Sequence, residues 1–273
     1  MDIEKFKKNG YIVVRNFYDI EKEILPLQRD IRKIIQLVAR AHDVIYEDTG
    51  LWHDGYLSIR KKNPALGGIV YDAVKQLASL NKIITKRESF EALTQLREAE
   101  GAILGIARNG CGIRIDDPGD IKFKTNWHQD YSGQLRSPGG ITIWAPLVNI
   151  TPELGPVTFA RSSHFEGVFP IHTVDRRFPL IKVDADAYTF ADEEERMAKY
   201  DHDTPLLNVG DVVFIDFLNA HKSGTNFAEH SRWTVQLRYF DFTEPIGVGH
   251  GWSGGVRSGI DFKEVHPEMF AGN

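Results

Sequence analysis

The chain has 273 residues, of which 42% are hydrophobic, and its formal net charge is −5 at pH 7. This length and apolar content can bury a sizeable core within one domain. The small acidic charge, without a long basic run, argues against nucleic acid or an anionic membrane as the main partner.

The single cysteine, Cys111, rules out an intramolecular disulfide framework and fits a reducing compartment. The first eight residues are rich in charge, and no long apolar run follows them. Neither a signal peptide nor a membrane span is therefore expected, and a cytoplasmic protein is the simplest interpretation.

Helical periodicity dominates the start of the chain. Apolar residues recur at three- and four-residue steps over 24–38, and Asp19 is suited to cap a helix that runs to about Ala41. Pro26 would kink that helix or mark its start. Further helices are predicted over 69–79 and 89–98, with 51–59 as a loop or short strand that reaches the active-site mouth.

From residue 102 onward the pattern changes to strands and turns. Strands are predicted at 103–107, 113–115, 121–127, 141–148, 157–160, 205–207, 212–217 and 232–242. We expect these strands to form two antiparallel sheets, which gives a mainly β fold with flanking helices. The specific prediction is a double-stranded β-helix, the jelly-roll barrel of the cupin type.

One domain over 1–273 is expected. Its parts are a mostly helical support (1–100), the barrel core (101–245), a lid insertion within that core (about 165–204) and a C-terminal tail (246–273). The insertion shows no clear strand except Lys182-Val183, and loops of this length are usually functional. Its acidic run at 192–195 is interpreted as a solvated helix face.

The most informative feature is a set of two histidines and one aspartate. His128 and Asp130 end the alternating stretch 121–128, so both project to one side if the strand continues. His221 follows the apolar strand 212–217, where a loop begins. Two imidazoles and one carboxylate can occupy one face of a six-coordinate iron, which is the facial triad of non-heme Fe(II) oxygenases. The alternative is a hydrogen-bonded core histidine beside a turn aspartate.

The strand that follows has one polar and one apolar face. Arg232, Thr234, Gln236 and Arg238 share the polar face, and Arg232 stands eleven residues after His221. This face is either a solvated edge or the lining of a barrel. A lining with two arginines would make a carboxylate pocket, because guanidinium binds a carboxylate through two parallel hydrogen bonds.

Together these motifs give the chain a resemblance to the phytanoyl-CoA dioxygenase family of Fe(II)/2-oxoglutarate-dependent oxygenases, over most of its length. The matching segments are 6–17, Trp127-His128-Gln129-Asp130, 143–147, 153–157, Arg161-Ser162-Ser163-His164, His221-Lys222-Ser223 and Arg232. The turn Glu153-Leu154-Gly155 departs from the Asn-Gly that is more usual there.

The resemblance implies a complete set of cofactor contacts. His128, Asp130 and His221 would bind Fe(II), with 2-oxoglutarate and O2 as co-substrates. Residues that would hold 2-oxoglutarate are Arg232, at its distal carboxylate, and Ser223, Trp144 and Asn126. The implied reaction hydroxylates an unactivated C–H bond and releases succinate and CO2.

The expected substrate is a small polar metabolite that carries a carboxylate, phosphate or phosphonate. The candidate contacts are Arg238, Gln236, Tyr131 and Arg114. An acyl-CoA or carrier-bound substrate is the alternative, since the insertion could supply an apolar wall. Asp130 argues against the related halogenases, which have a small residue in that place. Desaturation or ring formation would need the same ligands.

Two other functional classes stay open. A cupin-like hydrolase or isomerase could use the same three ligands for zinc or manganese, because imidazole and carboxylate do not select iron by affinity. Such an enzyme would have no need of Arg232. A catalytically silent binding protein would be expected to lose a ligand, and all three are present.

Overall fold

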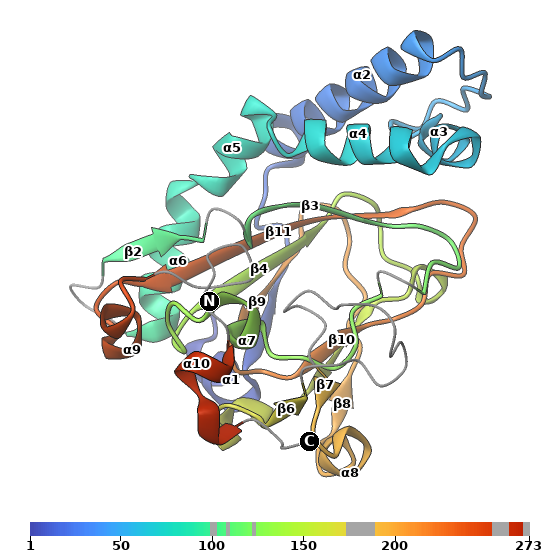
Figure 1. Cartoon of the computed structure of the whole chain (residues 1–273). Coiled ribbons are helices and arrows are strands. Elements are labelled where there is room, and N and C mark those ends of the chain that lie inside the picture. Colours follow the sequence, from blue (N-terminus) through green and yellow to red (C-terminus); the bar gives the residue numbers. More distant parts are fainter. Residues whose placement is uncertain (99–102, 108–109, 122–123, 173–188, 253–261, 270–273) are drawn as a thin grey trace.

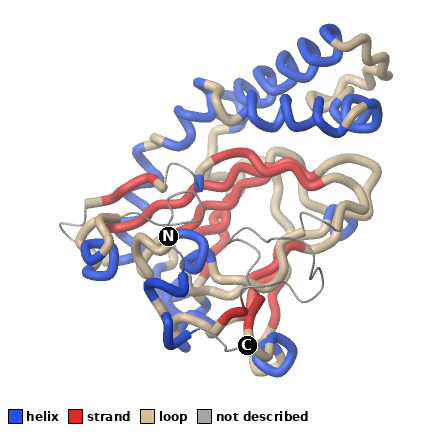
Figure 2. The backbone as a smooth tube through the Cα atoms, in the orientation of Figure 1, coloured by secondary structure: helices blue, strands red, loops and turns tan. Residues whose placement is uncertain are grey.

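The computed structural model describes residues 1–98, 103–107, 110–121, 124–172, 189–252 and 262–269. Antiparallel sheets form the body of the molecule, and a layer of helices lies along one side of it (Figures 1 and 2). This arrangement is the mainly β fold with flanking helices that the sequence predicts.

The helices of the first third are α1 (Ile3–Asn9), α2 (Leu25–Ala41), α3 (Tyr56–Lys62), α4 (Pro64–Val74), α5 (Ala78–Ile84) and α6 (Arg87–Arg97). The predicted helix over 19–41 is confirmed. The Asp19 carboxylate accepts from the backbone of Lys22, and a π-helical turn (Ile20–Ile24) leads into α2. Pro26 lies in the first turn of α2, where a missing N–H costs no hydrogen bond.

Two predictions for this part of the chain were wrong, one in the type of element and one in its bounds. Helix α3 begins within the segment predicted as a loop or short strand, and α4 and α5 replace the single helix over 69–79. The overlooked signal is Asn63-Pro64, because the Asn63 side chain accepts from Ala65 N at 3.0 Å and Pro64 occupies the first turn. The prediction over 89–98 corresponds to α6.

The larger sheet runs in the order β1 (Tyr11–Val14), β9 (Val212–Asp216), β4 (Ile141–Pro146), β11 (Arg232–Asp241) and β2 (Leu104–Ile106), with β3 (Gly112–Asp116) also paired to β11. The smaller sheet is β10 (His221–Ser223), β5 (Val157–Ala160) and β8 (His202–Asp203). A two-stranded ribbon joins β6 (Ile171–His172) to β7 (Thr189–Phe190). All of these pairings are antiparallel. Tyr11 of β1 stacks on Phe159 of β5 with ring centroids 4.3 Å apart, so the two sheets face each other.

Two predicted strands are corrected. Residues 121 and 124–127 form no strand, and His128 makes only an isolated bridge. Residues 205–207 are also irregular, and β8 pairs with β5 instead. The prediction for Lys182-Val183 lies outside the described residues. The acidic run begins α8 (Glu193–Met197), whose glutamates are exposed or half-buried, as predicted.

Short helices complete the chain. They are α7 (Asp130–Gln134), η3 (Pro152–Leu154), η4 (Ser163–Glu166), α9 (Pro245–Gly249), α10 (Phe262–Val265) and η7 (Pro267–Met269). No helix in the described ranges is both long and apolar enough to cross a membrane.

The main core lies between the helical layer and the apolar face of β11. Trp233 is fully buried, with ring centroids 5.2 Å from Trp52 and 4.9 Å from Tyr56. Further along the strand, the Tyr239 hydroxyl donates to Ile84 O at 2.8 Å. The apolar face of β11 is therefore turned to the helices, and the polar face points into the space between the two sheets.

Candidate metal centre

Three side chains that the sequence singles out meet between the sheets. One potential ligand atom from each of His128, Asp130 and His221 lies within 4.8 Å of the others. His128 precedes α7, Asp130 is the first residue of α7, and His221 begins β10. The backbones of the two histidines bond reciprocally, at 3.0 Å in each direction, so β-bridge pairing sets the spacing of these two residues.

Each imidazole is oriented by a backbone carbonyl two residues earlier. The Nδ1 atom of His128 lies 2.8 Å from Asn126 O, and that of His221 lies 2.9 Å from Asn219 O. A carbonyl only accepts, so Nδ1–H donates in both rings. The two Nε2 atoms, 3.9 and 3.7 Å from the Asp130 oxygens, keep their lone pairs for a metal.

The Asp130 carboxylate is buried and held at both oxygens. Thr142 Oγ1 donates to Oδ2 at 2.6 Å. Arg238 donates to Oδ1 from Nε at 2.9 Å and from Nη2 at 2.8 Å. Burial raises the pKa of Asp130, but Arg238 and the two histidines outweigh it and bring the pKa below its usual value. The carboxylate is therefore ionised and fixed in orientation.

The electrostatics favour the ligand state that a metal needs. Burial, with His128 nearby, lowers the pKa of His221 to about 4. Burial also lowers the pKa of His128. Neutral imidazoles beside an ionised carboxylate are the forms that bind a metal. Two nitrogen donors and one oxygen donor on converging elements fit a divalent ion such as Fe(II), with open positions left for other ligands.

Arg232, expected to bind a carboxylate, is almost fully buried at 1% exposure and already faces one. Its Nε donates to Asp116 Oδ2 at 3.2 Å, and its Nη2 lies 2.9 Å from the same oxygen. Its Nη1 donates to the carbonyls of Leu154 and Gly155. Arg114 Nε donates to the other Asp116 oxygen at 2.8 Å.

Of the remaining predicted residues, Trp144, Gln236 and Ser223 lie on strands of the two sheets, whereas Tyr131 points away from them. Trp144 and Gln236 are register partners on β4 and β11, and Gln236 Oε1 lies 3.4 Å from Arg238 Nη2. Ser223 is buried on β10, two residues after His221. Tyr131 points elsewhere, because its hydroxyl bonds to His266 Nε2 at 2.8 Å in the buried cluster that contains Phe262.

Three residues beside this centre were not singled out from the sequence. Thr142 holds Asp130, Asp116 faces Arg232, and Asn219 supplies the carbonyl that orients His221. Thr142 stands opposite Arg238, and Asp116 stands opposite Arg232, in the strand registers. Alternation along one strand cannot identify a partner on another, so no local signal was available for these contacts.

A prediction follows for Thr142. Replacement Thr142→Val keeps the shape and removes the hydroxyl that fixes Asp130, so the affinity for Fe(II) should fall by about 10- to 100-fold. Anaerobic competition against a chelator measures this affinity. The matched control is Thr158→Val on β5, which removes a hydroxyl contact to Thr204. Equal affinities in the two variants would show that Thr142 does not orient the ligand.

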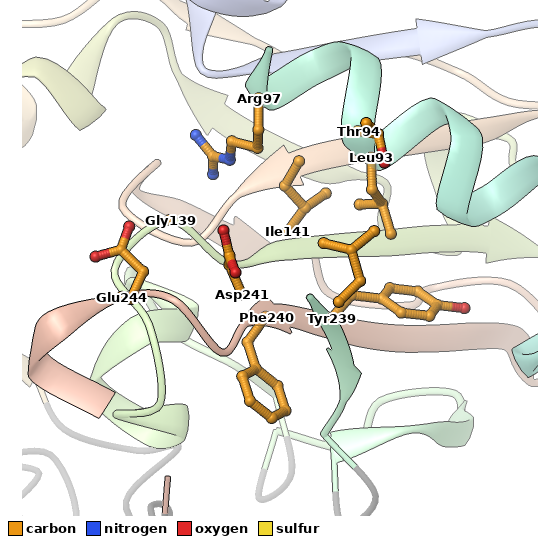
Figure 3. A pocket seen from close by; sticks show the side chains of 10 residues that line it. Leu93, Thr94, Arg97, Gly139, Ile141, Tyr239, Phe240, Asp241 and Glu244 are labelled. Atoms are coloured by element: carbon orange, nitrogen blue, oxygen red, sulfur yellow. The ribbon is translucent and has the colours of Figure 1, made fainter. Parts of the chain in front are cut away.

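A cavity of about 140 Å³ lies apart from these residues. Leu93, Thr94 and Arg97 of α6 line it together with Ile141 and Tyr239 on the core-facing side of the larger sheet (Figure 3). None of the three candidate ligands contributes to its wall. The cavity is therefore a packing space between α6 and the sheet, distinct from the metal centre.

Comparisons with known proteins agree with this geometry. The sequence model of the phytanoyl-CoA dioxygenase (PhyH) family matches residues 6–234. No curated protein matches the sequence.

Similar solved structures share the fold. The epimerase SnoN from nogalamycin biosynthesis, solved with Fe3+, alpha ketoglutarate and nogalamycin RO, is 17% identical, with 95% of this chain and 90% of that chain covered and a TM-score of 0.59. The carbocyclase SnoK from nogalamycin biosynthesis is 17% identical, with 88% and 83% covered and a TM-score of 0.55. EvdO2 from Micromonospora carbonacea var. aurantiaca is 16% identical, with 87% and 89% covered and a TM-score of 0.51.

Proposed function

The chain belongs to the phytanoyl-CoA dioxygenase family of Fe(II)- and 2-oxoglutarate-dependent oxygenases, and from that premise we propose that it hydroxylates a small anionic metabolite. The observation that carries the proposal is the convergence of His128, Asp130 and His221 in the protonation states that Fe(II) requires. Succinate and CO2 would be released with each turnover.

The three candidate ligands would together hold the metal ion. Nε2 of His128, Nε2 of His221 and one oxygen of Asp130 would hold Fe(II). When bound with 2-oxoglutarate and O2, the iron supplies the oxidising power for C–H cleavage. Thr142 and Arg238 keep the carboxylate in one orientation, so that the open metal positions face the same space in every molecule.

Residues at the other end of the same space would place the co-substrate. We assign the distal carboxylate of 2-oxoglutarate to Arg232, with Ser223 and Trp144 beside it. Asn126 contributes indirectly, since its carbonyl orients His128. A guanidinium that anchors one end of the co-substrate makes its chelation at the metal reproducible.

The charge between the sheets supports an anionic substrate. Arg114 and Arg232 pair with Asp116, and Arg238 pairs with Asp130, so three guanidinium groups lie on two carboxylates here. In addition, Arg136 lies over the Phe240 ring at 5.7 Å, and no carboxylate pairs with it in the described part of the chain. A carboxylate, phosphate or phosphonate would complement guanidinium groups of this kind, with Arg238, Gln236 and Arg114 as the proposed contacts. Tyr131 is a weaker candidate because its hydroxyl bonds to His266.

Anaerobic titration with 2-oxoglutarate tests the assignment. The Fe(II)-loaded protein should develop a visible metal-to-ligand charge-transfer band, and Arg232→Ala should need about 10- to 100-fold more co-substrate, the scale of a lost charged hydrogen-bond pair. 2-Oxobutanoate, which lacks the distal carboxylate, should bind both proteins equally. Circular dichroism verifies that the variant is folded.

Absence of the charge-transfer band would contradict the co-substrate assignment. If no band forms with iron verified in place, the co-substrate assignment fails, and metal-dependent turnover without O2 would favour a zinc or manganese hydrolase or isomerase. If the band forms, acidic metabolites and acyl thioesters are screened for stimulated succinate release. Mass spectrometry of the product then separates addition of an oxygen atom from loss of hydrogen.

A further inference from the structure

Arg232 has a resident partner inside the protein. Asp116 stands directly opposite Arg232 in the register of β3 and β11, and alternation places both side chains on the face that points between the sheets. Arg232 is 1% exposed, and the Asp116 side chain is 12% exposed. Their pairing is therefore an internal contact, shielded from water and from dissolved salt.

This pairing uses the edge of Arg232 that a ligand would need. A guanidinium grips a carboxylate most firmly through two parallel N–H groups. The Nε and Nη2 atoms of Arg232 both face Asp116 Oδ2, while Nη1 donates to the Leu154 and Gly155 carbonyls. A second carboxylate cannot obtain a two-bond grip while all these contacts persist.

Arg114 supplies an alternative partner for the same aspartate. Asp116 directs Oδ1 to Arg114 at 2.8 Å and Oδ2 to Arg232. If Arg232 turns to another carboxylate, Asp116 keeps one charged hydrogen bond and is not left as an unpaired buried anion, which would be strongly unfavourable. A second carboxylate would then give Arg232 an anionic partner in place of Asp116.

We propose that Asp116 competes with 2-oxoglutarate for Arg232. In the free enzyme Asp116 pairs with Arg232; when 2-oxoglutarate binds, Arg232 turns to its distal carboxylate and Asp116 stays paired with Arg114. This inference rests on the proposed function, because it takes 2-oxoglutarate as the ligand of Arg232. Asp116 then sets how much co-substrate the enzyme needs. Its effect is confined to the distal carboxylate, since within the described ranges the Asp116 carboxylate pairs with Arg114 and Arg232 and with none of the three metal ligands.

The test is equilibrium binding, followed through the charge-transfer band of the Fe(II) protein without O2. Asp116→Asn should bind 2-oxoglutarate about tenfold more tightly than the wild type, the scale of one charged hydrogen bond. Its affinity for 2-oxobutanoate should not change. Asp117→Asn is the matched control, since that neighbouring carboxylate pairs with Arg60 at 2.8 Å and accepts from Ser231 at 2.7 Å.

Arg114→Ala provides a second and independent test. Without its alternative partner, Asp116 should hold Arg232 more firmly, so 2-oxoglutarate should bind more weakly than to the wild type. In the double variant with Asp116→Asn this loss should disappear, because the effect of Arg114 passes through Asp116. A simple field effect of the Arg114 charge would instead weaken binding equally in both backgrounds.

The possible results distinguish a failure of the proposed function from a failure of the competitor role of Asp116. If the wild type gives no charge-transfer band, the proposed function itself fails. If the wild type binds 2-oxoglutarate but Asp116→Asn binds it equally or more weakly, or binds both oxo acids more tightly, the competitor role of Asp116 is overturned. If Asp116→Asn does not fold, an unchanged affinity in Arg114→Ala overturns it instead.

Discussion

Asp130→Ala is expected to abolish Fe(II) binding at micromolar protein and to lower co-substrate turnover by more than about a hundredfold. Loss of a residue that only supports a metal ligand typically costs 10- to 100-fold, so loss of the ligand itself should exceed that range. The change removes the carboxylate of the candidate cluster and leaves Arg238 without the ion pair that it makes there. A guanidinium there would also repel the cation.

The measurement combines chelator competition for Fe(II) with succinate release from 2-oxoglutarate. Asp48→Ala is a suitable control, because Asp48 also receives two hydrogen bonds from an arginine, Arg32, at 2.8 and 2.7 Å, but lies outside the metal centre. Its metal affinity should match that of the wild type. Wild-type iron affinity in Asp130→Ala would remove Asp130 from the ligand set.

Trp233→Ala is expected to lower the free energy of unfolding by about 3–5 kcal/mol. Trp233 is fully buried and packs against Trp52 and Tyr56, so its loss leaves a cavity between β11 and the helical layer. Because the helices within residues 1–98 and the larger sheet share this core, unfolding should remain one cooperative transition. Urea denaturation followed by tryptophan fluorescence and by circular dichroism measures both properties.

The control for this change is Phe227→Ala. Phe227 is 78% exposed, so its replacement should alter the free energy of unfolding by less than about 0.5 kcal/mol. A similarly small effect at Trp233 would mean that the helices contribute little to the stability of the sheet. Two separate transitions would contradict a single domain over 1–273.

The three side chains of the candidate metal centre could be singled out from the sequence by residue type and spacing. His128 and Asp130 are two residues apart, and His221 follows an apolar strand. The strand predicted to carry His128 and Asp130 was wrong, because Asp130 begins α7. The alternation of β11 predicted which face carries Arg232 and which carries Trp233. These inferences need the period of one strand and nothing from its neighbours.

Other features depend on pairing between distant segments. The contact of Asp116 with Arg232 follows from the register of β3 and β11, which no single strand encodes. Tyr131 was predicted as a candidate substrate contact. Its hydroxyl bonds instead to His266, 135 residues further along the chain, and such a distant contact leaves no local pattern in the sequence.

The reciprocal backbone bonds between His128 and His221 bear on the choice of metal. The backbone bonds fix the spacing of the two residues, and the carbonyls of Asn126 and Asn219 fix the Nδ1 atoms of the two imidazole rings. Neither contact depends on an ion. The conformational entropy of gathering these ligands is lost when the chain folds, not when the metal arrives. Such preorganisation lets the protein discriminate among divalent ions by coordination geometry, where intrinsic affinity would favour copper over iron.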